Sequence, residues 1–218
     1  MNSPTIQAVA FDLDGLMFDT EALFFRVAAE MLEERGKVFT KEIMAQMIGR
    51  QAPVAGLAFK TMAGLDESVD ALMLEARGRF NDLLDEAVHP TPGLFTLLDH
   101  LADRRYPIAV ATSSRRAFAE GILTRHKLID RFQFLLTAED VTRSKPDPEI
   151  YQKAAERFGL DPGALLVLED SPAGTTAART SGAFVVGVPH EHSPAEALGK
   201  AHKLIPRLDA PALMALLP

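Results

Sequence analysis

The sequence predicts an α/β fold: a Rossmann-like parallel sheet core with helices on both faces, and an α-helical domain inserted into that core. Three observations predict it. Short apolar runs alternate with segments whose apolar residues recur at helical spacing. The runs are apolar at successive positions, as in parallel strands that are buried on both faces. One long segment, residues 19–89, interrupts the alternation and contains no strand-like run.

The predicted strands are five apolar runs, which lie in residues 7–13, 108–112, 134–137, 164–168 and 183–188. The helices predicted between them occupy residues 93–104, 115–126, 148–158 and 172–181. The first of these helices has one apolar stripe, formed by Leu94, Leu97, Leu98 and Leu101. Pro148 stands in the first turn of the third helix, where its missing N–H costs nothing, and Gly182 provides a stop after the fourth.

The interrupting segment is rich in Ala, Leu, Met, Glu and Arg, and Leu23, Val27 and Met31 recur in it at helical spacing. Prolines and a glycine at residues 90–93 mark the return to the alternating pattern. We therefore predict two domains. Residues 1–18 and 90–218 form a discontinuous α/β core, and residues 19–89 form a helical domain.

The composition narrows the classes of function. Lys and Arg number 23 against 30 Asp and Glu, which gives a formal net charge of −7, and basic residues gather only in short pairs, so no nucleic-acid partner is expected. The absence of cysteine excludes disulfides, thiolate metal sites and cysteine nucleophiles, and it fits a reducing cytoplasm. The start of the chain lacks a signal-peptide pattern, and no stretch approaches about 20 apolar residues, so no membrane partner is expected.

Asp12 and Asp14 follow the first predicted strand and stand two residues apart. In an extended strand residues i and i+2 point the same way, so both carboxylates aim at one place. They repel each other unless they share a proton or a cation, and Mg²⁺ prefers oxygen ligands of this kind. One aspartate can then attack phosphorus while the other moves protons. A simple turn or a partial calcium loop explains the same D-x-D-G pattern, so the pair alone leaves these alternatives open.

Polar residues also follow later strands. Thr112, Ser113 and Ser114 offer hydroxyl and backbone N–H groups at a strand-to-helix junction, which suits an anion, although Ser and Thr are also ordinary helix caps. Lys145 precedes Pro146 in a rigid, non-helical segment, where it can face a phosphate or simply lie on the surface.

Glu169 and Asp170 follow the most apolar run, where buried acids are costly unless they are paired or bound to a metal. A solvated loop pair, or a helix cap near Ser171, is the alternative. In parallel sheets the carboxyl ends of the strands meet at one edge. Four acids, one lysine and a hydroxyl cluster at the ends of four strands therefore predict one site for a metal ion and an anionic substrate.

The assembled pattern resembles the haloacid dehalogenase-like superfamily, in its phosphatase and phosphomutase branch. The matching segments are FDLDGLMFDTE at 11–21, VATSS at 110–114, KPDPEIY at 145–151 and VLEDSPAG at 167–174, in the family's order and spacing. The resemblance implies a phosphatase acting on a small phosphorylated metabolite through an aspartyl-phosphate, with Mg²⁺ as cofactor.

Roles follow from the same resemblance, residue by residue. Asp12 matches the nucleophile, and Asp14 the general acid that later serves as base. Thr112 matches the hydroxyl that binds the transferring phosphoryl group, with Ser113 and Ser114 beside it. Lys145 matches the lysine that steadies the charge of the nucleophile and phosphate. The Mg²⁺ ligands implied are Asp12, the Asp14 carbonyl, Glu169 and Asp170.

The helical insert is then a cap that closes over the site, with hinges near residues 18–20 and 87–91. Glu21, Gly49 and Arg50 occur where related caps contact substrate, although a solvated charge is as good an interpretation of Arg50. Because the cap already covers the site, we expect a monomer.

Other functions stay open at this point. A β-phosphoglucomutase-like mutase shares the motifs and cap position, but it tends to carry a histidine in the first cap helix, where this chain has Phe24. A true dehalogenase generally lacks the second aspartate, and a phospho-acceptor signalling module is shorter and lacks a cap. A non-catalytic protein that keeps the fold only for binding is the last alternative, which the intact motif set disfavours. The resemblance is closest to enzymes that act on sugar phosphates or nucleotide-related phosphates, including the pseudouridine-5′-phosphate phosphatase-like group.

One further polar group, His190-Glu191-His192, suggests a transition-metal site, since imidazole is a common metal ligand. The segment follows a strand and precedes Ser193-Pro194, so we interpret it as a loop that can border the substrate.

Overall fold

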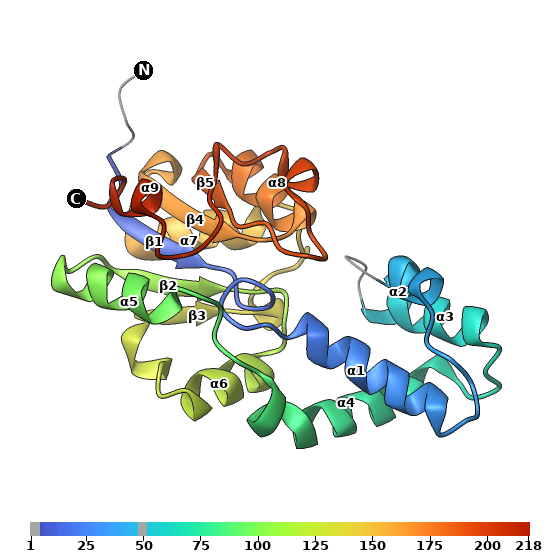
Figure 1. The fold of residues 1–218 in the computed structure, drawn as a ribbon. Helices are drawn as coiled ribbons and strands as arrows, with labels where there is room; N and C mark the ends of the chain where they lie inside the picture. The colour runs from blue at the N-terminus through green and yellow to red at the C-terminus, as the bar shows by residue number, and fades with distance from the viewer. Residues whose placement is uncertain (1–4, 48–51) are drawn as a thin grey trace. The chain divides into compact units, whose positions relative to one another are not determined.

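The computed structural model describes residues 5–47 and 52–218, and the chain divides into two compact units (Figure 1). The first unit combines Met1–Phe18 with Pro90–Pro218, and the second is Asp19–His89. The chain therefore passes between the units twice, after Phe18 and after His89. Among the described residues, no helix is both long and apolar enough to cross a membrane.

The first unit is built on a six-stranded sheet in which every neighbouring pair is parallel. Its strands are β1 (Ala8–Phe11), β2 (Ile108–Ala111), β3 (Phe134–Leu136), β4 (Leu165–Glu169), β5 (Phe184–Gly187) and β6 (Lys203–Leu204). The order across the sheet is β3-β2-β1-β4-β5-β6. The connections run to one side of β1 for β2 and β3, and to the other side for β4 to β6. That reversal places a crevice at the carboxyl ends of the central strands, where ligands bind in such sheets.

In the described part of this unit, five helices accompany the sheet: α5 (Leu94–Asp103), α6 (Arg116–Arg125), α7 (Glu149–Phe158), α8 (Pro172–Ser181) and α9 (Pro211–Met214). Short 3₁₀ turns lie at Ile129–Arg131, Ala138–Asp140, Pro162–Ala164 and Ala195–Leu198. The predicted parallel α/β fold is confirmed. The two-residue β6 and the single-turn α9 were not predicted, because neither is long enough to show a periodic pattern.

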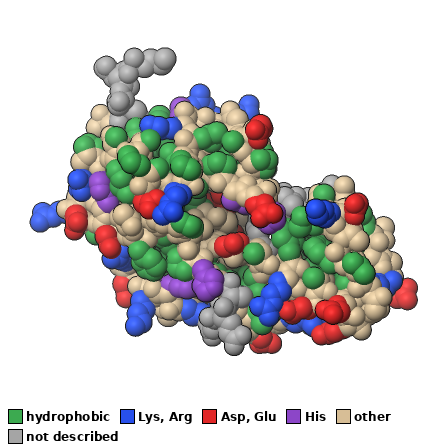
Figure 2. All heavy atoms as spheres, in the orientation of Figure 1, with side chains coloured by type: hydrophobic (Ala, Val, Ile, Leu, Met, Phe, Trp, Pro, Cys, Tyr) green, Lys and Arg blue, Asp and Glu red, His purple; other side chains and the backbone are tan. Residues whose placement is uncertain are grey.

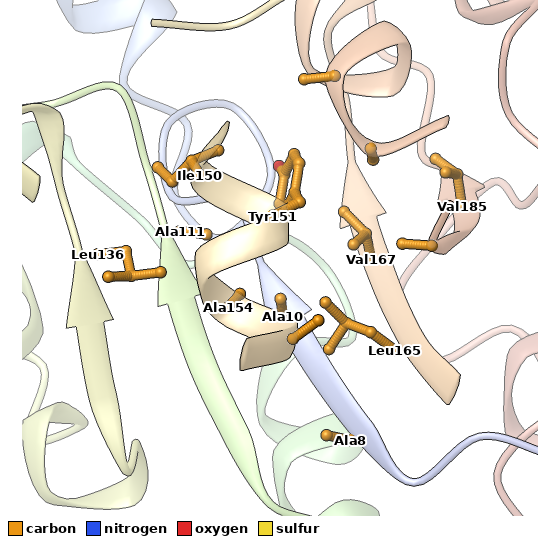
Figure 3. Packing of buried hydrophobic residues seen from close by; sticks show 14 residues of the cluster. Ala8, Ala10, Ala111, Leu136, Ile150, Tyr151, Ala154, Leu165, Val167 and Val185 are labelled. Atoms are coloured by element: carbon orange, nitrogen blue, oxygen red, sulfur yellow. The ribbon is translucent and has the colours of Figure 1, made fainter. Parts of the chain in front are cut away.

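Small residues let α7 and α8 pack closely on one face of the sheet. Ala154 of α7 lies over Ala10 and Leu165, within a cluster that also takes in Ala177 and Val185 (Figure 3). The alternate strand residues point to the other face and are also fully buried; they include Val9, Phe11, Val110, Leu166 and Val186. Both faces of the sheet are therefore covered, which explains why the strands are apolar at every position.

The start of α8 is fixed by local chemistry. The Ser171 side chain accepts a hydrogen bond from the Gly174 N–H (2.9 Å), and Pro172 occupies the first helical position. At the other end, Gly182 adopts a left-handed conformation (φ 92°) that ends the helix. The segment after β4 is thus held tightly where it enters the helix.

The second unit consists of α1 (Glu21–Glu33), α2 (Lys41–Met47), α3 (Ala52–Ala63) and α4 (Val69–Ala87). Two arginines connect its helices. Arg35 pairs with Glu67 and Glu75, and Arg79 pairs with Glu34 and Glu75. The Phe24 ring of α1 stacks on Phe80 of α4, with ring centroids 4.2 Å apart.

Charges of both signs are interspersed over the face of the molecule seen in Figure 2. Neither sign of charge forms one continuous patch on this face.

Candidate active site

Three parallel strands bring the predicted site residues to one edge of the sheet. Asp12 follows β1 directly, and its N–H donates to the Leu168 carbonyl of β4 (3.1 Å). Thr112 follows β2, and its N–H donates to the Leu136 carbonyl of β3 (2.9 Å). Glu169 is the last residue of β4. The strand register therefore fixes the backbone of all three residues before any side chain is considered.

Lys145 lies at the centre of the site and is almost fully buried. Its ammonium group donates to Asp12, to the Ala111 carbonyl (3.0 Å) and to Glu169 Oε1 (2.7 Å). All three of its N–H donors thus have acceptors. Burial opposes the charged form, but Asp12 and Glu169 outweigh that effect, so the pKa of Lys145 lies well above its usual range. The lysine is a fixed positive charge beside Asp12.

Asp12 is surrounded by more negative charge than Lys145 neutralises. Burial raises the pKa of Asp12, Lys145 lowers it, and the carboxylates of Glu169, Asp170 and Asp14 raise it again, so the pKa lies well above its usual value. A second cation near Asp12 would neutralise this excess negative charge. Asp12 and Asp170 are buried, and carboxylate oxygens such as theirs are the ligands that a hard divalent ion prefers.

The described residues contain no preformed group of three His, Cys, Asp or Glu side chains arranged around a metal position. This does not conflict with Mg²⁺, which keeps several waters and is usually held by one or two carboxylates together with substrate phosphate. The residues present therefore fit such an ion.

The role of Glu169 as a metal ligand stays a prediction, and in the structure other groups engage both of its oxygens. Oε1 accepts from Lys145 (2.7 Å) and from the Tyr151 hydroxyl (2.7 Å). Oε2 accepts from the Asp170 N–H, the Ser171 N–H and the Ser171 hydroxyl, each at 3.0 Å. Burial alone would raise the pKa of Glu169, but Lys145 brings it below its usual value, so the carboxylate stays ionised. Its Oε1 atom accepts from the same ammonium group that donates to Asp12.

Gly174 makes room for this buried carboxylate. A Cβ atom at Gly174 would lie 1.6 Å from Glu169 Oε1 and 2.2 Å from Oε2, far inside contact distance. The side chain cannot move aside without losing its bonds to Lys145 and Tyr151. Packing against Glu169 therefore requires glycine at position 174, the last residue of the segment VLEDSPAG.

The substitution Gly174→Ala is expected to destabilise the first unit by about 3 kcal/mol or more, at the upper end of what overpacking costs. Chemical denaturation followed by circular dichroism measures this. Gly121→Ala in α6 is the matched control, because a Cβ there meets only the end of Arg125, at 3.5 Å. That variant should be neutral or stabilised by up to about 1 kcal/mol. Equal behaviour of the two variants would contradict the packing argument.

Tyr151 is a site residue to which the sequence assigned no role. It projects from the first turn of α7 and is fully buried (Figure 3). Its hydroxyl donates to Glu169, and its ring lies beneath Lys145 with Nζ 4.9 Å from the ring centroid. Burial and the neighbouring Glu169 charge raise the pKa of Tyr151 well above its usual value, so the hydroxyl remains a donor. Its place in KPDPEIY, six residues after Lys145, was the available signal.

Removing the hydroxyl in Tyr151→Phe is expected to cost about 2 kcal/mol of unfolding free energy, since a hydrogen bond to a buried charge is lost while the ring packing stays. Urea denaturation at pH 7 tests this. Tyr106→Phe changes the only other tyrosine, which lies at the amino end of β2 away from the site, and should change stability by less than about 0.5 kcal/mol. A similar change in stability in both variants would show that the hydrogen bond from Tyr151 to Glu169 does not stabilise the fold.

Asp14 forms the second part of the site with two hydroxyl residues. The Ser114 hydroxyl donates to Asp14 Oδ2 (2.6 Å), and Thr112 Oγ1 lies 3.4 Å from the same oxygen. The Ser114 N–H donates in turn to Thr112 Oγ1 (3.0 Å). Ser113 is exposed at this edge. The structure thus brings Asp14, Thr112 and Ser114 together.

Gly15 closes the turn after Asp14 and leaves space for Asp170. Its φ of +79° lies in the left-handed region that favours glycine, and its N–H donates to the Phe18 carbonyl (2.9 Å). A Cβ at Gly15 would lie 2.2 Å from Asp170 Oδ2. The same Asp170 oxygen lies 3.0 Å from His190 Nε2, a second contact that the sequence did not predict.

The structure does not describe the predicted substrate contacts of the insert. Glu21 begins α1 in the second unit, and its side chain lies outside the described residues, as do Gly49 and Arg50 altogether. Their roles stay predictions.

The arrangement combines a buried carboxylate fixed by a lysine, a second carboxyl group bonded to a hydroxyl, and acids suited to a divalent cation. Such a set can stabilise the charge of a phosphoryl group during transfer and can move a proton to or from an oxygen.

The chain is similar to a family of hydrolases and to several known phosphatases. The profile of a family described as haloacid dehalogenase-like hydrolase matches residues 9–188. Validoxylamine A 7′-phosphate phosphatase of Streptomyces hygroscopicus subsp. limoneus is 34% identical over 89% of this chain and 91% of that protein. A probable pseudouridine-5′-phosphatase of Drosophila melanogaster is 37% identical over 82% and 80%. The crystal structure of a HAD family hydrolase from Deinococcus radiodurans R1, with bound phosphate and sodium, superposes with a TM-score of 0.80 at 26% identity over 95% and 93% of the chains.

Proposed function

Because the chain belongs to the haloacid dehalogenase-like hydrolase family, we propose that it is a Mg²⁺-dependent phosphatase that cleaves a small phosphate monoester through an aspartyl-phosphate on Asp12. The observation that carries the proposal is the ion pair between buried Asp12 and Lys145. Asp14, two residues after Asp12, accepts a hydrogen bond from the Ser114 hydroxyl beside this pair. The family membership establishes an enzyme, and this geometry supports the particular chemistry.

In the first half-reaction a carboxylate oxygen of Asp12 attacks phosphorus, and the bond between phosphorus and the ester oxygen breaks. Lys145 holds Oδ1 of Asp12, so we assign the attack to Oδ2. Asp14, in its protonated form, gives its proton to the departing alkoxide, which leaves as an alcohol. In-line placement is the main requirement of such a transfer.

In the second half-reaction Asp14, now a carboxylate, accepts a proton from water while the water oxygen attacks phosphorus. The bond between phosphorus and Asp12 breaks, which releases phosphate and restores both aspartates. Ser114 holds Asp14 by its Oδ2 throughout, and Thr112 offers its hydroxyl to the phosphoryl oxygens.

The metal ligands we propose are Asp12, Asp170 and the Asp14 carbonyl, and a role of Glu169 as a ligand stays a prediction. A divalent cation bound there would neutralise phosphate charge and favour the ionised form of Asp12, whose pKa is otherwise raised by burial.

For the substrate we propose a sugar phosphate or a nucleotide-related phosphate. The support is the similarity to two relatives, a validoxylamine A 7′-phosphate phosphatase and a probable pseudouridine-5′-phosphatase. A mutase of the β-phosphoglucomutase kind is the second candidate. Phe24, which stands where such mutases tend to have histidine, stacks on Phe80 and carries no group that transfers protons. We also propose a cytoplasmic location, in keeping with a cysteine-free chain, and a monomer, in keeping with a cap predicted to cover the site.

The test is an assay of the purified protein on a panel of phosphate monoesters, with Mg²⁺ and with EDTA. The panel contains sugar phosphates, nucleotides, pseudouridine 5′-phosphate and β-glucose 1-phosphate, and both free phosphate and isomerised sugar phosphate are measured. Mg²⁺-dependent phosphate release supports the proposal. Isomerised product with little free phosphate would establish the mutase instead, and phosphate release unaffected by EDTA would remove the metal from the mechanism.

A further inference from the structure

The turn after β5 carries His190 to the edge of the site and holds its backbone there. The Val188 N–H donates to the Glu169 carbonyl (2.8 Å), which extends the β4–β5 pairing into this turn. His190 and Ser193 then exchange two backbone hydrogen bonds, each 3.1 Å long. The predicted loop at residues 190–192 is therefore a closed turn, with the His190 ring fixed at its base.

Both ring nitrogens of His190 are engaged. Nε2 lies 3.0 Å from Asp170 Oδ2, and Nδ1 lies 3.3 Å from the backbone nitrogen of His192. A backbone N–H only donates, so Nδ1 is the acceptor of that bond. In the neutral imidazole the proton must then reside on Nε2, which donates it to Asp170. The hydrogen bond that Nδ1 accepts from His192 thus selects the tautomer with the proton on Nε2, which the contact with Asp170 requires.

Two neighbours fix the Asp170 carboxylate at its Oδ2 atom. Its Oδ2 atom lies against Gly15, where any Cβ would clash, and against the Nε2–H of His190. The residue is 4% exposed and lies between the fully engaged Glu169 and Ser171, the N-cap of α8. With Oδ2 fixed by His190, the rotation of the carboxyl group about its Cβ–Cγ bond is fixed as well, and the direction of Oδ1 follows.

We propose that His190 is a positioning residue for the cation site: its Nε2–H orients the Asp170 carboxylate for a divalent metal ion. The inference rests on the proposed function, because it takes Asp170 as a metal ligand. Partners of this kind orient metal-binding side chains, and their loss typically weakens metal affinity or activity by about 10- to 100-fold. His190 acts through Asp170 and is not itself a ligand.

A purely structural role for the ring is the competing explanation. His190 borders a cavity of about 130 Å³, lined also by Gly15, Leu16, Thr91 and Pro189, so truncation enlarges an existing space. Two substitutions of similar bulk separate the explanations. His190→Gln keeps an N–H donor that can reach Asp170, whereas His190→Leu fills the space without any donor.

The experiment measures Mn²⁺ binding to the full chain by electron paramagnetic resonance, in the absence of substrate. The proteins are the wild type, Asp170→Asn, His190→Leu, His190→Gln, His190→Ala and, as a control in the same turn, Glu191→Gln at an exposed position. Circular dichroism melting checks that each is folded, and the alanine variant replaces the leucine variant if the latter does not fold.

We expect Asp170→Asn to abolish specific binding and the donor-free His190 variants to weaken it by at least about 10-fold. The glutamine variant should bind within a few-fold of the wild type, and Glu191→Gln should equal it. Wild-type affinity in the donor-free variants, with binding lost in Asp170→Asn, would overturn the role of His190 and leave the proposed function intact. Equal loss in the glutamine and leucine variants would also overturn it. Mn²⁺ binding that does not depend on Asp170 would overturn the metal site and this inference together.

Discussion

Replacing Asp12 with asparagine is expected to lower kcat by about 10⁴-fold or more, because the amide cannot form an aspartyl-phosphate. The amide has nearly the shape of the carboxyl group and can still accept a hydrogen bond from Lys145 through its oxygen. The fold should therefore survive. Phosphate release from the best substrate of the panel measures the effect, with Asp161→Asn at an exposed position as the matched control.

The same variant makes a second, independent prediction about stability. Burial and three neighbouring carboxylates raise the folded-state pKa of Asp12 above its unfolded value, so its ionised form opposes folding at neutral pH. A carboxyl group with a raised folded-state pKa stabilises the folded state below its unfolded pKa of about 4. This stabilisation is lost as the pH rises through the folded-state pKa. Asp12→Asn should thus melt at or above the wild-type temperature at pH 7 in metal-free buffer, and the difference should vanish near pH 3.

Two results would contradict this account of Asp12. Retention of more than a few per cent of wild-type turnover would show that Asp12 is not the nucleophile. A large fall in melting temperature at pH 7 would show that its ionised form stabilises the metal-free fold, against the direction of its pKa. The Asp161→Asn control should change neither quantity.

Replacing Lys145 with methionine is expected to produce the largest loss of stability, about 3–5 kcal/mol of unfolding free energy at pH 7. The substitution keeps most of the apolar stem but leaves two buried carboxylates, those of Asp12 and Glu169, without their shared cation. Activity should fall as well, since the charge that steadies Asp12 is gone. Guanidinium denaturation across pH measures the first effect, with Lys200→Met at an exposed position as control.

The pH dependence of the Lys145→Met variant has a defined sign. Without the lysine, Asp12 and Glu169 are buried carboxyl groups whose folded pKa values lie above their unfolded values of about 4. Burying their ionised forms lowers the unfolding free energy of the variant at neutral pH, but not below about pH 4, where both groups are protonated. The difference in unfolding free energy from the wild type should therefore shrink in acid. Adding Glu169→Gln to the variant should recover part of the loss, because it removes one uncompensated charge. A deficit that is constant with pH would show that packing, rather than charge, is responsible.

The layout of the core and the position of its chemistry were determined by the sequence alone, for local reasons. Strands buried on both faces must be apolar throughout, and helix ends such as Pro172 and Gly182 follow from backbone chemistry within a few residues. Because parallel strands end at one edge, placing Asp12, Thr112 and Glu169 after strands was enough to predict that they meet. The short β6 and α9 escaped prediction because a strand of two residues and a single helical turn display no period.

The tertiary structure alone decided which partner each polar group takes. Glu169 is predicted from the sequence as a metal ligand, and in the structure its oxygens accept from Lys145, 24 residues earlier, from Tyr151, 18 residues earlier, and from the first N–H groups of the next segment. His190 reaches Asp170 only because β5 pairs with β4. Local sequence patterns specify where a backbone turns, because that depends on neighbours along the chain. The bonding of a buried charge depends on every group that packing brings within about 3 Å, and that set exists only once the chain has folded.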